Sequence, residues 1–352
     1  MTPIRVTHAG ADYEVLITSF SEALPALTAI AAGRRLPVIS DAAVFELYGG
    51  VFAPLATAEP IIVPSGEAAK DWQVLIGIVD RLAALNVKRG TPIIALGGGS
   101  VGDVAGLAAS LFKRGCPIIH VPTTLLSQAD SAIGGKTAID AGGQKNLVGT
   151  FHHPVMVVAD PAVLDTLDAR QRRSGYAEVV KYGLIDDPGF FEWCEANSAA
   201  VVAGAGAARG RAIEHCIRAK ARFVTADPDD TFGTRALLNF GHTFGHAIEA
   251  LAGQTLLHGE AVALGMALAF EFSGELGLCP VSDAERVNAH IRSMGLPVDL
   301  ADIGMERPAV LEAMQADKKS TAEGPVLILT KGIGKAFVAT NVDLQRLAAF
   351  LT

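Results

Sequence analysis

Hydrophobic positions in the first part of the chain alternate between short β-branched runs and helical patterns. The apolar runs are bounded by turn residues and predict buried strands at 15–18, 36–39, 61–63, 92–96, 117–121 and 155–158. Between the third and fourth of these runs, residues 70–85 have the spacing of an amphipathic helix. This alternation predicts a mainly parallel α/β sheet.

After about residue 160 the strand signals fade and helical patterns replace them. We expect helices at 170–184, 199–225, 234–251, 259–276 and 283–294, followed by a weak pair of strands at 326–329 and 335–338. A chain of 352 residues is long enough for two domains. The sequence therefore predicts an α/β domain at 1–160 and a mostly α-helical domain at 161–352.

One predicted helix carries a narrow line of polar residues in apolar surroundings. Along residues 235–249, polar residues follow one another at intervals of four, three, four and three positions, which places them on one side of a helix. They are Arg235, Asn239, His242, His246 and Glu249. The intervening residues from 236 to 248 are apolar, Gly or Thr, so the polar groups must find partners inside the protein. This pattern is typical of an active-site helix.

Imidazoles one turn apart can bind one metal ion, and a further histidine, His258, follows this helix. Spacing alone does not decide which of His242, His246 and His258 bind. Hydrogen-bonded core histidines are the structural alternative. In another predicted helix, Glu178 and Lys181 share a face; a surface ion pair is possible, but the apolar surroundings favour a buried carboxylate that binds a metal.

A glycine-rich turn follows the predicted strand 92–96. Gly97, Gly99 and Gly102 satisfy the spacing G-x-G-x-x-G, which brings backbone N–H groups and a helix N-terminus to a pyrophosphate. An acidic residue about twenty positions later is missing, so the ordinary dinucleotide-binding interpretation is weak, and a plain tight turn is the alternative.

Hydroxyl, amide and cationic residues are concentrated between Arg114 and residue 149. Lys136 and Lys145 are flanked by Gly and Asn, so their ammonium groups can approach a phosphate without steric obstruction. Two solvated lysines are the alternative, but the number of polar groups in this segment favours a binding site.

Composition narrows the possible functions. The formal net charge of −8 argues against a general nucleic-acid surface, although it does not exclude an anionic small-molecule substrate. The longest apolar run, 261–270, is shorter than the roughly eighteen residues of a membrane helix. The first residues lack the pattern of a signal peptide, and the four cysteines are scattered as small core residues are, so we expect a cytoplasmic protein.

Seven motifs in order resemble the 3-dehydroquinate synthase family, in a match that runs from about Pro64 to Asp343. They are Gly-Gly-Gly-x-x-Gly-Asp at 97–103, Pro-Thr-Thr-Leu-Leu at 122–126, Gly-Gly-Lys-Thr at 134–137, Lys-Asn at 145–146, Ala-Glu-Val-Val-Lys-Tyr-Gly at 177–183, Asn-x-Gly-His-Thr-x-Gly-His-Ala-x-Glu at 239–249 and His-Gly-Glu-Ala-Val at 258–262. The resemblance implies an N-terminal NAD-binding domain, a C-terminal helical zinc-binding domain, an active site in the cleft between them, and a homodimer.

The resemblance also implies roles for individual residues. The metal ligands are Glu178, His242 and His258, for Zn²⁺ with Co²⁺ as a possible substitute. The substrate pocket contains Arg114, Asp130, Lys136, Lys145, Asn146, Lys181, Lys220, Arg235, Asn239, His246 and one of Lys318 or Lys319. NAD contacts Ser65, Gly66, Glu67, Ala68, Ala69, Lys70, Gly99, Ser100, Val101, Gly102, Asp103, Thr123, Thr124, Lys136, Lys145, Val163, Leu164, Asp165 and Thr166, with Leu167 and Gln171 on the same side.

Two departures from the family pattern are visible. The family commonly has Asp-Glu-x-Glu before a Gly-x-Arg sequence, whereas this chain has Asp-Pro-Asp-Asp-Thr-Phe-Gly-Thr-Arg at 227–235, so Asp230 is left out of the site. Ser65 also stands where Asp is usual, which can alter one contact to the cofactor.

The implied activity converts 3-deoxy-D-arabino-heptulosonate 7-phosphate to 3-dehydroquinate and phosphate, the second step of the shikimate pathway. It combines transient oxidation by NAD, phosphate elimination, reduction and an intramolecular aldol step, so that NAD is catalytic. The alternatives are another sugar phosphate cyclase of the inosose or valiolone type, a metal-dependent polyol dehydrogenase, and a non-catalytic NAD-binding protein. The cations at 114, 136, 145 and 235 favour a phosphorylated substrate over a simple polyol.

Overall fold

The computed structural model describes residues 3–7, 12–204, 206–228, 230, 233–318, 326–340 and 342–352, with the backbone alone at 316–318. The chain forms two compact units. The first unit is Met1–Leu167 with Gly210–Asp229, and the second unit is Asp168–Arg209 with Asp230–Thr352. The boundary that we expect at residue 160 stays a prediction.

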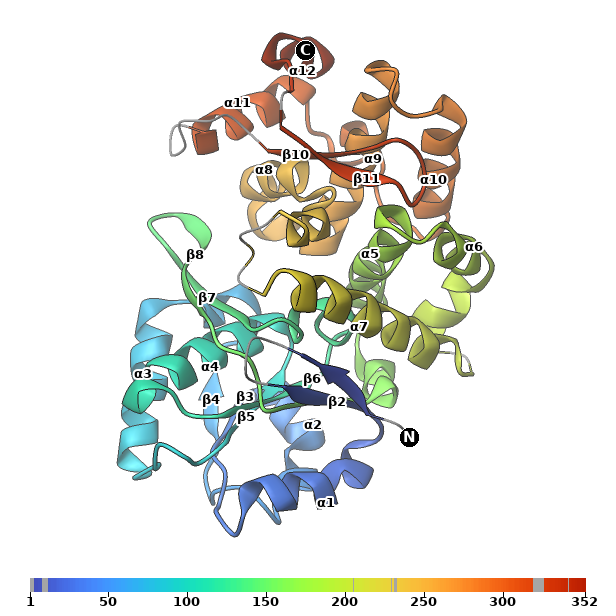
Figure 1. Cartoon of the computed structure of the whole chain (residues 1–352). Coiled ribbons are helices and arrows are strands. Elements are labelled where there is room, and N and C mark those ends of the chain that lie inside the picture. Colours follow the sequence, from blue (N-terminus) through green and yellow to red (C-terminus); the bar gives the residue numbers. More distant parts are fainter. Residues whose placement is uncertain are drawn as a thin grey trace. The chain divides into compact units, whose positions relative to one another are not determined.

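The first unit contains a seven-stranded sheet in the order β1-β2-β9-β6-β5-β3-β4. Figure 1 labels β2, β3, β4, β5 and β6 of this sheet. Its strands are β1 (Ile4–Val6), β2 (Tyr13–Ile17), β3 (Val38–Asp41), β4 (Ile61–Val63), β5 (Ile93–Gly97), β6 (Ile118–Pro122) and β9 (Met156–Ala159). All neighbours are parallel except the antiparallel pair β1 and β2. The predicted mainly parallel α/β sheet is confirmed, and each predicted strand lies within two residues of an observed one.

Helices cover this sheet because its central strands are apolar on both faces. Every residue of β3, β5, β6 and β9 is buried. The helices between β2 and β6 are α1 (Phe20–Ala31), α2 (Ala42–Phe52), α3 (Trp72–Ala84) and α4 (Gly99–Leu111), with short helical turns η1 (Gly66–Ala69) and η2 (Phe112–Arg114). The apolar sides of α3 and α4 pack with strand residues in one core cluster.

A β-hairpin that the sequence pattern did not predict follows β6 and a π-helical turn, η3 (Ser127–Ser131). Its strands, β7 (Lys136–Ala141) and β8 (Gln144–Phe151), are antiparallel, and Gly142 and Gly143 form the turn. Most of β8 is exposed, so the segment has no buried apolar face that alternation could reveal. The first unit also contains the turn η4 (Pro161–Thr166).

The second unit is mostly helical, as predicted. Its elements are α5 (Ala169–Ile185), α6 (Pro188–Ala203), η5 (Arg235–Asn239), α8 (His242–Ala252), η6 (Gly253–Thr255), α9 (His258–Glu275), α10 (Val281–Ser293), η7 (Leu300–Ile303), α11 (Arg307–Lys318), β10 (Leu327–Thr330), β11 (Ala336–Ala339) and α12 (Leu344–Phe350). The predicted strand pair is confirmed, since β10 and β11 are antiparallel neighbours.

The predicted helix at 199–225 is wrong as one element. The chain forms α6 and then α7 (Ala208–Ala226), and from Gly210 onward α7 belongs to the first unit. α6 ends because Gly204 adopts a left-handed conformation, with φ of 82°, and donates its N–H to Ala200.

The predicted single helix at 234–251 is also wrong. Residues Arg235–Asn239 form the 3₁₀ turn η5, and α8 begins only at His242. Between them Gly241 has φ of 81°, and a Cβ there would lie 2.6 Å from Cγ of Met266 in α9. The polar line is therefore divided between two elements by a contact with a distant part of the chain.

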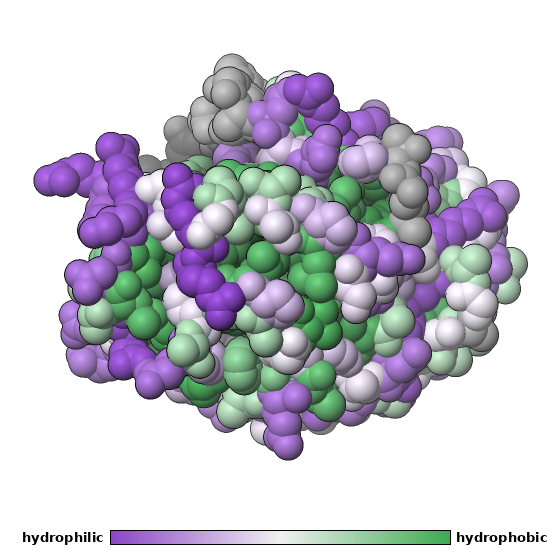
Figure 2. Space-filling model, turned by 90° about the horizontal axis from the view of Figure 1, so that it is seen from below, coloured by the Kyte–Doolittle hydropathy of each residue, from purple (hydrophilic) through white to green (hydrophobic). Residues whose placement is uncertain are grey.

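Apolar side chains reach the surface in places, as Figure 2 shows for one face where hydrophobic and hydrophilic residues are interspersed. A mixed surface of this kind is ordinary for a globular protein. Among the described residues, no helix is both long enough and apolar enough to span a membrane.

Candidate active site

Three side chains of the second unit form a group that can hold a metal ion. Glu178 comes from the middle of α5, His242 is the first residue of α8, and His258 is the first residue of α9. One possible ligand atom from each lies within 4.8 Å of the others. Oε1 of Glu178 is 3.6 Å from Nε2 of His242 and 3.7 Å from Nε2 of His258.

These distances suit tetrahedral zinc, because bonds of about 2.0 to 2.1 Å place neighbouring ligand atoms roughly 3.3 Å apart. Two imidazole nitrogens and one carboxylate oxygen also match the donor set of catalytic zinc sites, which leave a fourth position open. The group is the ligand set that the family resemblance implied, and it includes a residue that the spacing of the polar line does not contain.

Hydrogen bonds at the opposite ring nitrogens prepare both histidines for this role. Nδ1 of His242 lies 3.2 Å from the carbonyl oxygen of Phe240, and Nδ1 of His258 lies 3.2 Å from Oε2 of Glu249. Because each acceptor requires a proton on Nδ1, the neutral rings keep a lone pair on Nε2. The Nε2 atoms are the ones that face Glu178.

The carboxylate of Glu178 is buried in a way that favours a bound cation. Its side chain is 1% exposed, and Oε2 pairs with the ammonium of Lys181. Oε1 has no hydrogen-bond partner among the described residues. Such a buried oxygen is costly unless further positive charge compensates it. The residues present therefore fit a divalent metal.

Protonation of the two imidazoles follows their surroundings. Burial lowers the pKa of His242 well below its usual value, and the neighbouring Lys181 and histidines lower it further. Burial also lowers the pKa of His258, but the hydrogen bond to Glu249 and the charge of Glu178 outweigh it, so that pKa is raised. His242 is thus held in the neutral form that a metal needs.

Close backbone contacts fix the three ligands relative to one another. The N–H of Gly259, next to His258, donates to Oγ of Ser174, one turn before Glu178. At the crossing of α8 and α9, a Cβ on Gly265 would lie 1.9 Å from the carbonyl oxygen of Gly241, next to His242. Glycine is required at these points because any side chain would separate the helices.

His246 lies beside the metal group rather than in it. It is one turn after His242 in α8, and its ring centroid is 5.4 Å from that of His242 and 6.2 Å from that of His258. Arg235, 1% exposed in η5, and the exposed Asn239 belong to the same unit. Their roles toward a substrate stay predictions.

In the first unit, the glycine turn joins β5 to the N-terminus of α4. Gly98 is the N-cap and has no side chain that could accept a hydrogen bond from the helix. The first N–H groups of the helix are therefore available to an anion. A Cβ on Gly98 would be 3.0 Å from Cγ2 of Thr124, and one on Gly99 would be 3.1 Å from Oγ of Ser131. These glycines allow the segment after β6 to pack closely on the helix end.

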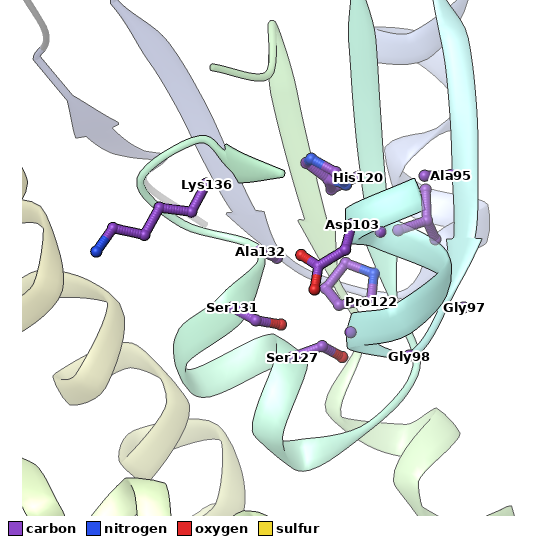
Figure 3. Close-up of a pocket in the computed structure, with 13 residues that line it drawn as sticks. Ala95, Gly97, Gly98, Asp103, His120, Pro122, Ser127, Ser131, Ala132 and Lys136 are labelled. Carbon is purple, nitrogen blue, oxygen red and sulfur yellow. The ribbon is translucent and has the colours of Figure 1, made fainter. Parts of the chain in front are cut away.

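A pocket lies at this helix end (Figure 3). It is lined by Ala95, Gly97, Gly98, Gly99, Gly102, Asp103, His120, Val121, Pro122, Ser127, Ser131, Ala132 and Lys136. Figure 3 shows the carboxylate of Asp103 near the hydroxyl of Ser131, and the side chain of Lys136 extending away from Asp103. Four predicted NAD contacts, Gly99, Gly102, Asp103 and Lys136, therefore share one pocket.

Lys70 joins predicted cofactor and substrate residues. Its buried ammonium lies 2.9 Å from Oδ2 of Asp103 and 3.7 Å from Oε2 of Glu67, and it also contacts Oδ1 of Asn146. Burial lowers the pKa of Lys70, but Asp103 and Glu67 outweigh that effect and raise it. Lys145 lies on the hairpin, with Nζ 3.5 Å from Oε1 of Glu67.

The ion pair of Lys220 and Asp130 unites two more predicted substrate residues. Nζ of Lys220, in α7, lies 2.9 Å from Oδ1 and 2.8 Å from the backbone oxygen of Asp130, in the π-helical turn. The two residues are ninety positions apart, so the sequence could pair them only through the family resemblance.

Most remaining predicted cofactor residues are placed by short helical turns. Ser65 precedes η1, which contains Gly66, Glu67, Ala68 and Ala69, while Ser100 and Val101 lie in the first turn of α4. Thr124 makes a 2.8 Å hydroxyl contact with Ser127, directly after β6 and Thr123. Val163 and Leu164 are buried in η4, which also contains Asp165 and Thr166.

Two polar residues outside the predicted set lie near these elements. Asp41 ends β3, which pairs with β5 beside the glycine turn, and its Oδ1 accepts the N–H of Val44. An acid at the end of a neighbouring strand suits hydrogen bonds to a ribose, and this one precedes the glycine turn in the sequence instead of following it. Tyr48 makes a 2.7 Å hydroxyl contact with Thr166, and no sequence signal marks it.

Arg114 is placed differently. It follows α4 with φ of 62°, and it lines a second hollow together with Arg89, His152 and His153. This hollow shares no lining residue with the pocket of Figure 3.

Lys319 lies outside the described residues, as does the side chain of Lys318. In the altered segment, residues 229, 231 and 232 also lie outside them, whereas Asp227 is buried.

Comparisons with known proteins agree with this architecture. Residues 60–174 match the family model described as 3-dehydroquinate synthase N-terminal, and residues 175–320 match the one described as 3-dehydroquinate synthase C-terminal. The 3-dehydroquinate synthase of Zymomonas mobilis is 47% identical over 99% of this chain and 94% of that protein.

Two solved structures are also similar. The 2-epi-5-epi-valiolone synthase of Streptomyces hygroscopicus, with NAD⁺ and Zn²⁺ bound, has a TM-score of 0.89 and 30% identity, covering 98% of this chain and 97% of its own. A 2-deoxy-scyllo-inosose synthase complexed with carbaglucose-6-phosphate, NAD⁺ and Co²⁺ has a TM-score of 0.86 and 27% identity, covering 99% of both chains. With both family models matched in order and a curated relative similar over nearly its full length, the chain belongs to the 3-dehydroquinate synthase family.

Proposed function

We propose that this protein converts 3-deoxy-D-arabino-heptulosonate 7-phosphate to 3-dehydroquinate and phosphate, as a carbon–oxygen lyase of the shikimate pathway leading to chorismate and the aromatic amino acids. The observation that carries the proposal is the 47% identity to a curated 3-dehydroquinate synthase over 99% of the chain. The metal group and the helix N-terminus at the glycine turn support it with chemistry.

When bound, a divalent metal would polarise the substrate hydroxyl that is oxidised, and NAD would accept and then return its hydride. Glu178, His242 and His258 hold the metal, and their hydrogen bonds to Phe240 and Glu249 keep both Nε2 atoms available. The glycine turn and the N-terminus of α4 bind the pyrophosphate of NAD through backbone N–H groups.

The cationic residues act on the substrate phosphate. Lys136, Lys145 and Arg235 hold it while its charge changes, and one of its own oxygens takes the proton in the elimination. Lys181 keeps its ammonium beside Glu178, where it can donate a hydrogen bond to a substrate oxygen. His246, next to the ligand His242, is available to hydrogen-bond the substrate. The proposal requires the residues of both units to act on one substrate molecule.

The rival sugar phosphate cyclases use the same oxidation and elimination. The similarity to them is lower, at 30% and 27% identity, than the 47% to the 3-dehydroquinate synthase, which supports the dehydroquinate reaction. A polyol dehydrogenase would not require the phosphate-binding cations.

Finer features are part of the same proposal. The donor set of two imidazoles and a carboxylate supports zinc as the metal. The four cysteines are buried thiols, in keeping with a reducing cytoplasm. The family resemblance supports a homodimer, and light scattering after size-exclusion chromatography would measure that state.

The direct test incubates purified protein with the heptulosonate phosphate, NAD and Zn²⁺, and follows phosphate, product identity and NADH absorbance. We expect 3-dehydroquinate and phosphate in equal amounts, a requirement for NAD, and no accumulation of NADH. Stoichiometric NADH from a polyol, with no cyclic product from the sugar phosphate, would instead identify a dehydrogenase. A different ring formed from another sugar phosphate would identify one of the rival cyclases.

A further inference from the structure

Glu249 is a buried carboxylate to which the proposed mechanism assigns no contact with substrate or metal. It is 4% exposed in α8, and the residues on either side of it, Ile248 and Ala250, are apolar or small. A carboxylate in such surroundings needs a specific partner to offset its loss of hydration. The position belongs to the polar line of the sequence, and its hydrogen bond to a metal ligand suggests what the carboxylate does.

One partner is the imidazole of His258. Oε2 of Glu249 lies 3.2 Å from Nδ1, while the other ring nitrogen, Nε2, lies 3.7 Å from Oε1 of Glu178. One ring is thus held between two carboxylates, through opposite nitrogens. Since His258 is 31% exposed, packing alone leaves this ring more freedom than the 12% exposed His242 has.

The two histidines differ in what holds them. Nδ1 of His242 faces a backbone carbonyl, which carries no net charge and is fixed by the chain. Nδ1 of His258 faces an ionisable side chain from another helix. A carboxylate behind a metal-binding imidazole fixes the ring and its tautomer, and it makes the nitrogen that binds the metal more basic.

We propose that Glu249 is a positioning residue for the metal site, which acts through His258 by holding a proton on Nδ1 and directing Nε2 to the metal. This inference rests on the proposed function only in assuming that the protein binds a divalent metal. Glu249 itself does not contact the metal or the substrate.

The test compares Glu249→Ala and Glu249→Gln with wild type, using Co²⁺ as the probe. Loss of such a partner typically weakens metal binding by about 10- to 100-fold, so we expect that loss for Glu249→Ala in a chelator competition assay. The visible spectrum of the bound Co²⁺ should also change. Glu249→Gln should lose less, because its amide oxygen can still accept the Nδ1 proton while the charge is gone.

Glu271→Gln is the matched control. Glu271 lies on α9, the same helix as His258, and its carboxylate pairs with Arg307 at 2.7 Å instead of with a metal ligand. We expect this variant to keep wild-type Co²⁺ affinity and spectrum. The melting temperature of each metal-free protein shows whether a variant has folded, and the Gln variant carries the test if the Ala variant has not.

The possible outcomes distinguish a failure of the positioning role from a failure of the proposed function. Wild-type affinity and an unchanged Co²⁺ spectrum in folded Glu249→Ala or Glu249→Gln would overturn the positioning role, even if the wild-type enzyme is fully active. An equal loss of affinity in Glu271→Gln would also overturn it, since the effect would then be general to α9. If wild type itself binds no divalent metal, the proposed function fails, and with it the basis of this inference.

Discussion

A Cβ atom on Gly259 would lie 1.9 Å from the carbonyl oxygen of Ser174, so the first turn of α9 touches the backbone of α5 directly. The same glycine donates its N–H to Oγ of Ser174 at 3.1 Å. Because Gly259 follows His258 and Ser174 stands one turn before Glu178, this contact sets the separation of two metal ligands.

We expect Gly259→Ala to destabilise the protein and weaken metal binding together. The added methyl group cannot fit, and overpacking of this kind costs about 1 to 3 kcal/mol or more. Gly274→Ala is the control, because it lies on the same helix and its Cβ would be 3.9 Å from the nearest of its neighbours. Denaturant unfolding and chelator competition measure the two effects. Equal stability of both variants would show that α5 and α9 can separate without penalty.

The metal ligands can be distinguished from their neighbour by substitution. His242→Ala and His258→Ala should each lose bound zinc and activity together, because a three-ligand site reduced to two loses most of its affinity. His246→Ala should retain zinc, since the described metal group does not include it. Metal analysis of the purified variants decides the matter, and a zinc-free His246→Ala beside a loaded His242→Ala would reverse the assignment.

The parallel sheet could be predicted because its central strands are apolar on both faces, which a sequence shows directly. The hairpin of β7 and β8 could not, since exposed β8 is held by its pairing with β7 and has no buried face. The break at Gly241 was also hidden, because its cause is the contact with Met266 in another helix.

The candidate site could also be predicted only in part. Helical spacing identified His242, His246 and Glu249 as neighbours on one helix, and the structure keeps them together in α8. It could not supply Glu178, which reaches the histidines only through the packing of α5 on α9. The family motifs supplied the missing ligand, because matching a motif by position does not require knowledge of how the helices pack.

His120 should make stability depend on pH. Burial lowers its pKa from 6.5 to about 4, so the folded protein holds the ring neutral while the unfolded chain protonates it. This contribution to stability is complete above the unfolded pKa and is lost as pH falls from about 6.5 to about 4; it amounts to about 3 kcal/mol. Over that range, wild type should lose about this much more free energy of unfolding than His120→Gln. If the free energies of unfolding of the two proteins fall equally over that range, burial does not lower the pKa of His120.

Lys70 should contribute far more to stability than an exposed lysine or arginine. Its side chain is 4% exposed and pairs with Asp103 at 2.9 Å, so Lys70→Met would leave a largely buried carboxylate without its cation, at a cost of about 3 to 5 kcal/mol. Arg81→Met breaks the exposed pair with Glu59 and should cost less than about 1 kcal/mol. Urea unfolding of the two variants measures both costs. Similar losses of unfolding free energy would mean that the buried pair of Lys70 contributes no more than an exposed one.

Lys145→Ala tests the phosphate-binding role of the hairpin. The side chain is 42% exposed and its ammonium lies 3.5 Å from Glu67, so its removal should leave zinc content and thermal stability close to wild type. A hydrogen bond to a charged group is worth about 1.5 to 3 kcal/mol, so catalytic efficiency should fall by roughly 10- to 100-fold or slightly more.

Two controls separate phosphate binding from a general effect of lost charge. Lys88→Ala removes another exposed lysine of the first unit and should keep wild-type efficiency. A substrate analogue that lacks the phosphate should bind wild type and Lys145→Ala almost equally, because the lysine then has no anion to meet. If Lys145→Ala retains full efficiency, Lys145 is an ordinary surface cation, and the preference for a phosphorylated substrate must rest on Lys136 and Arg235 alone.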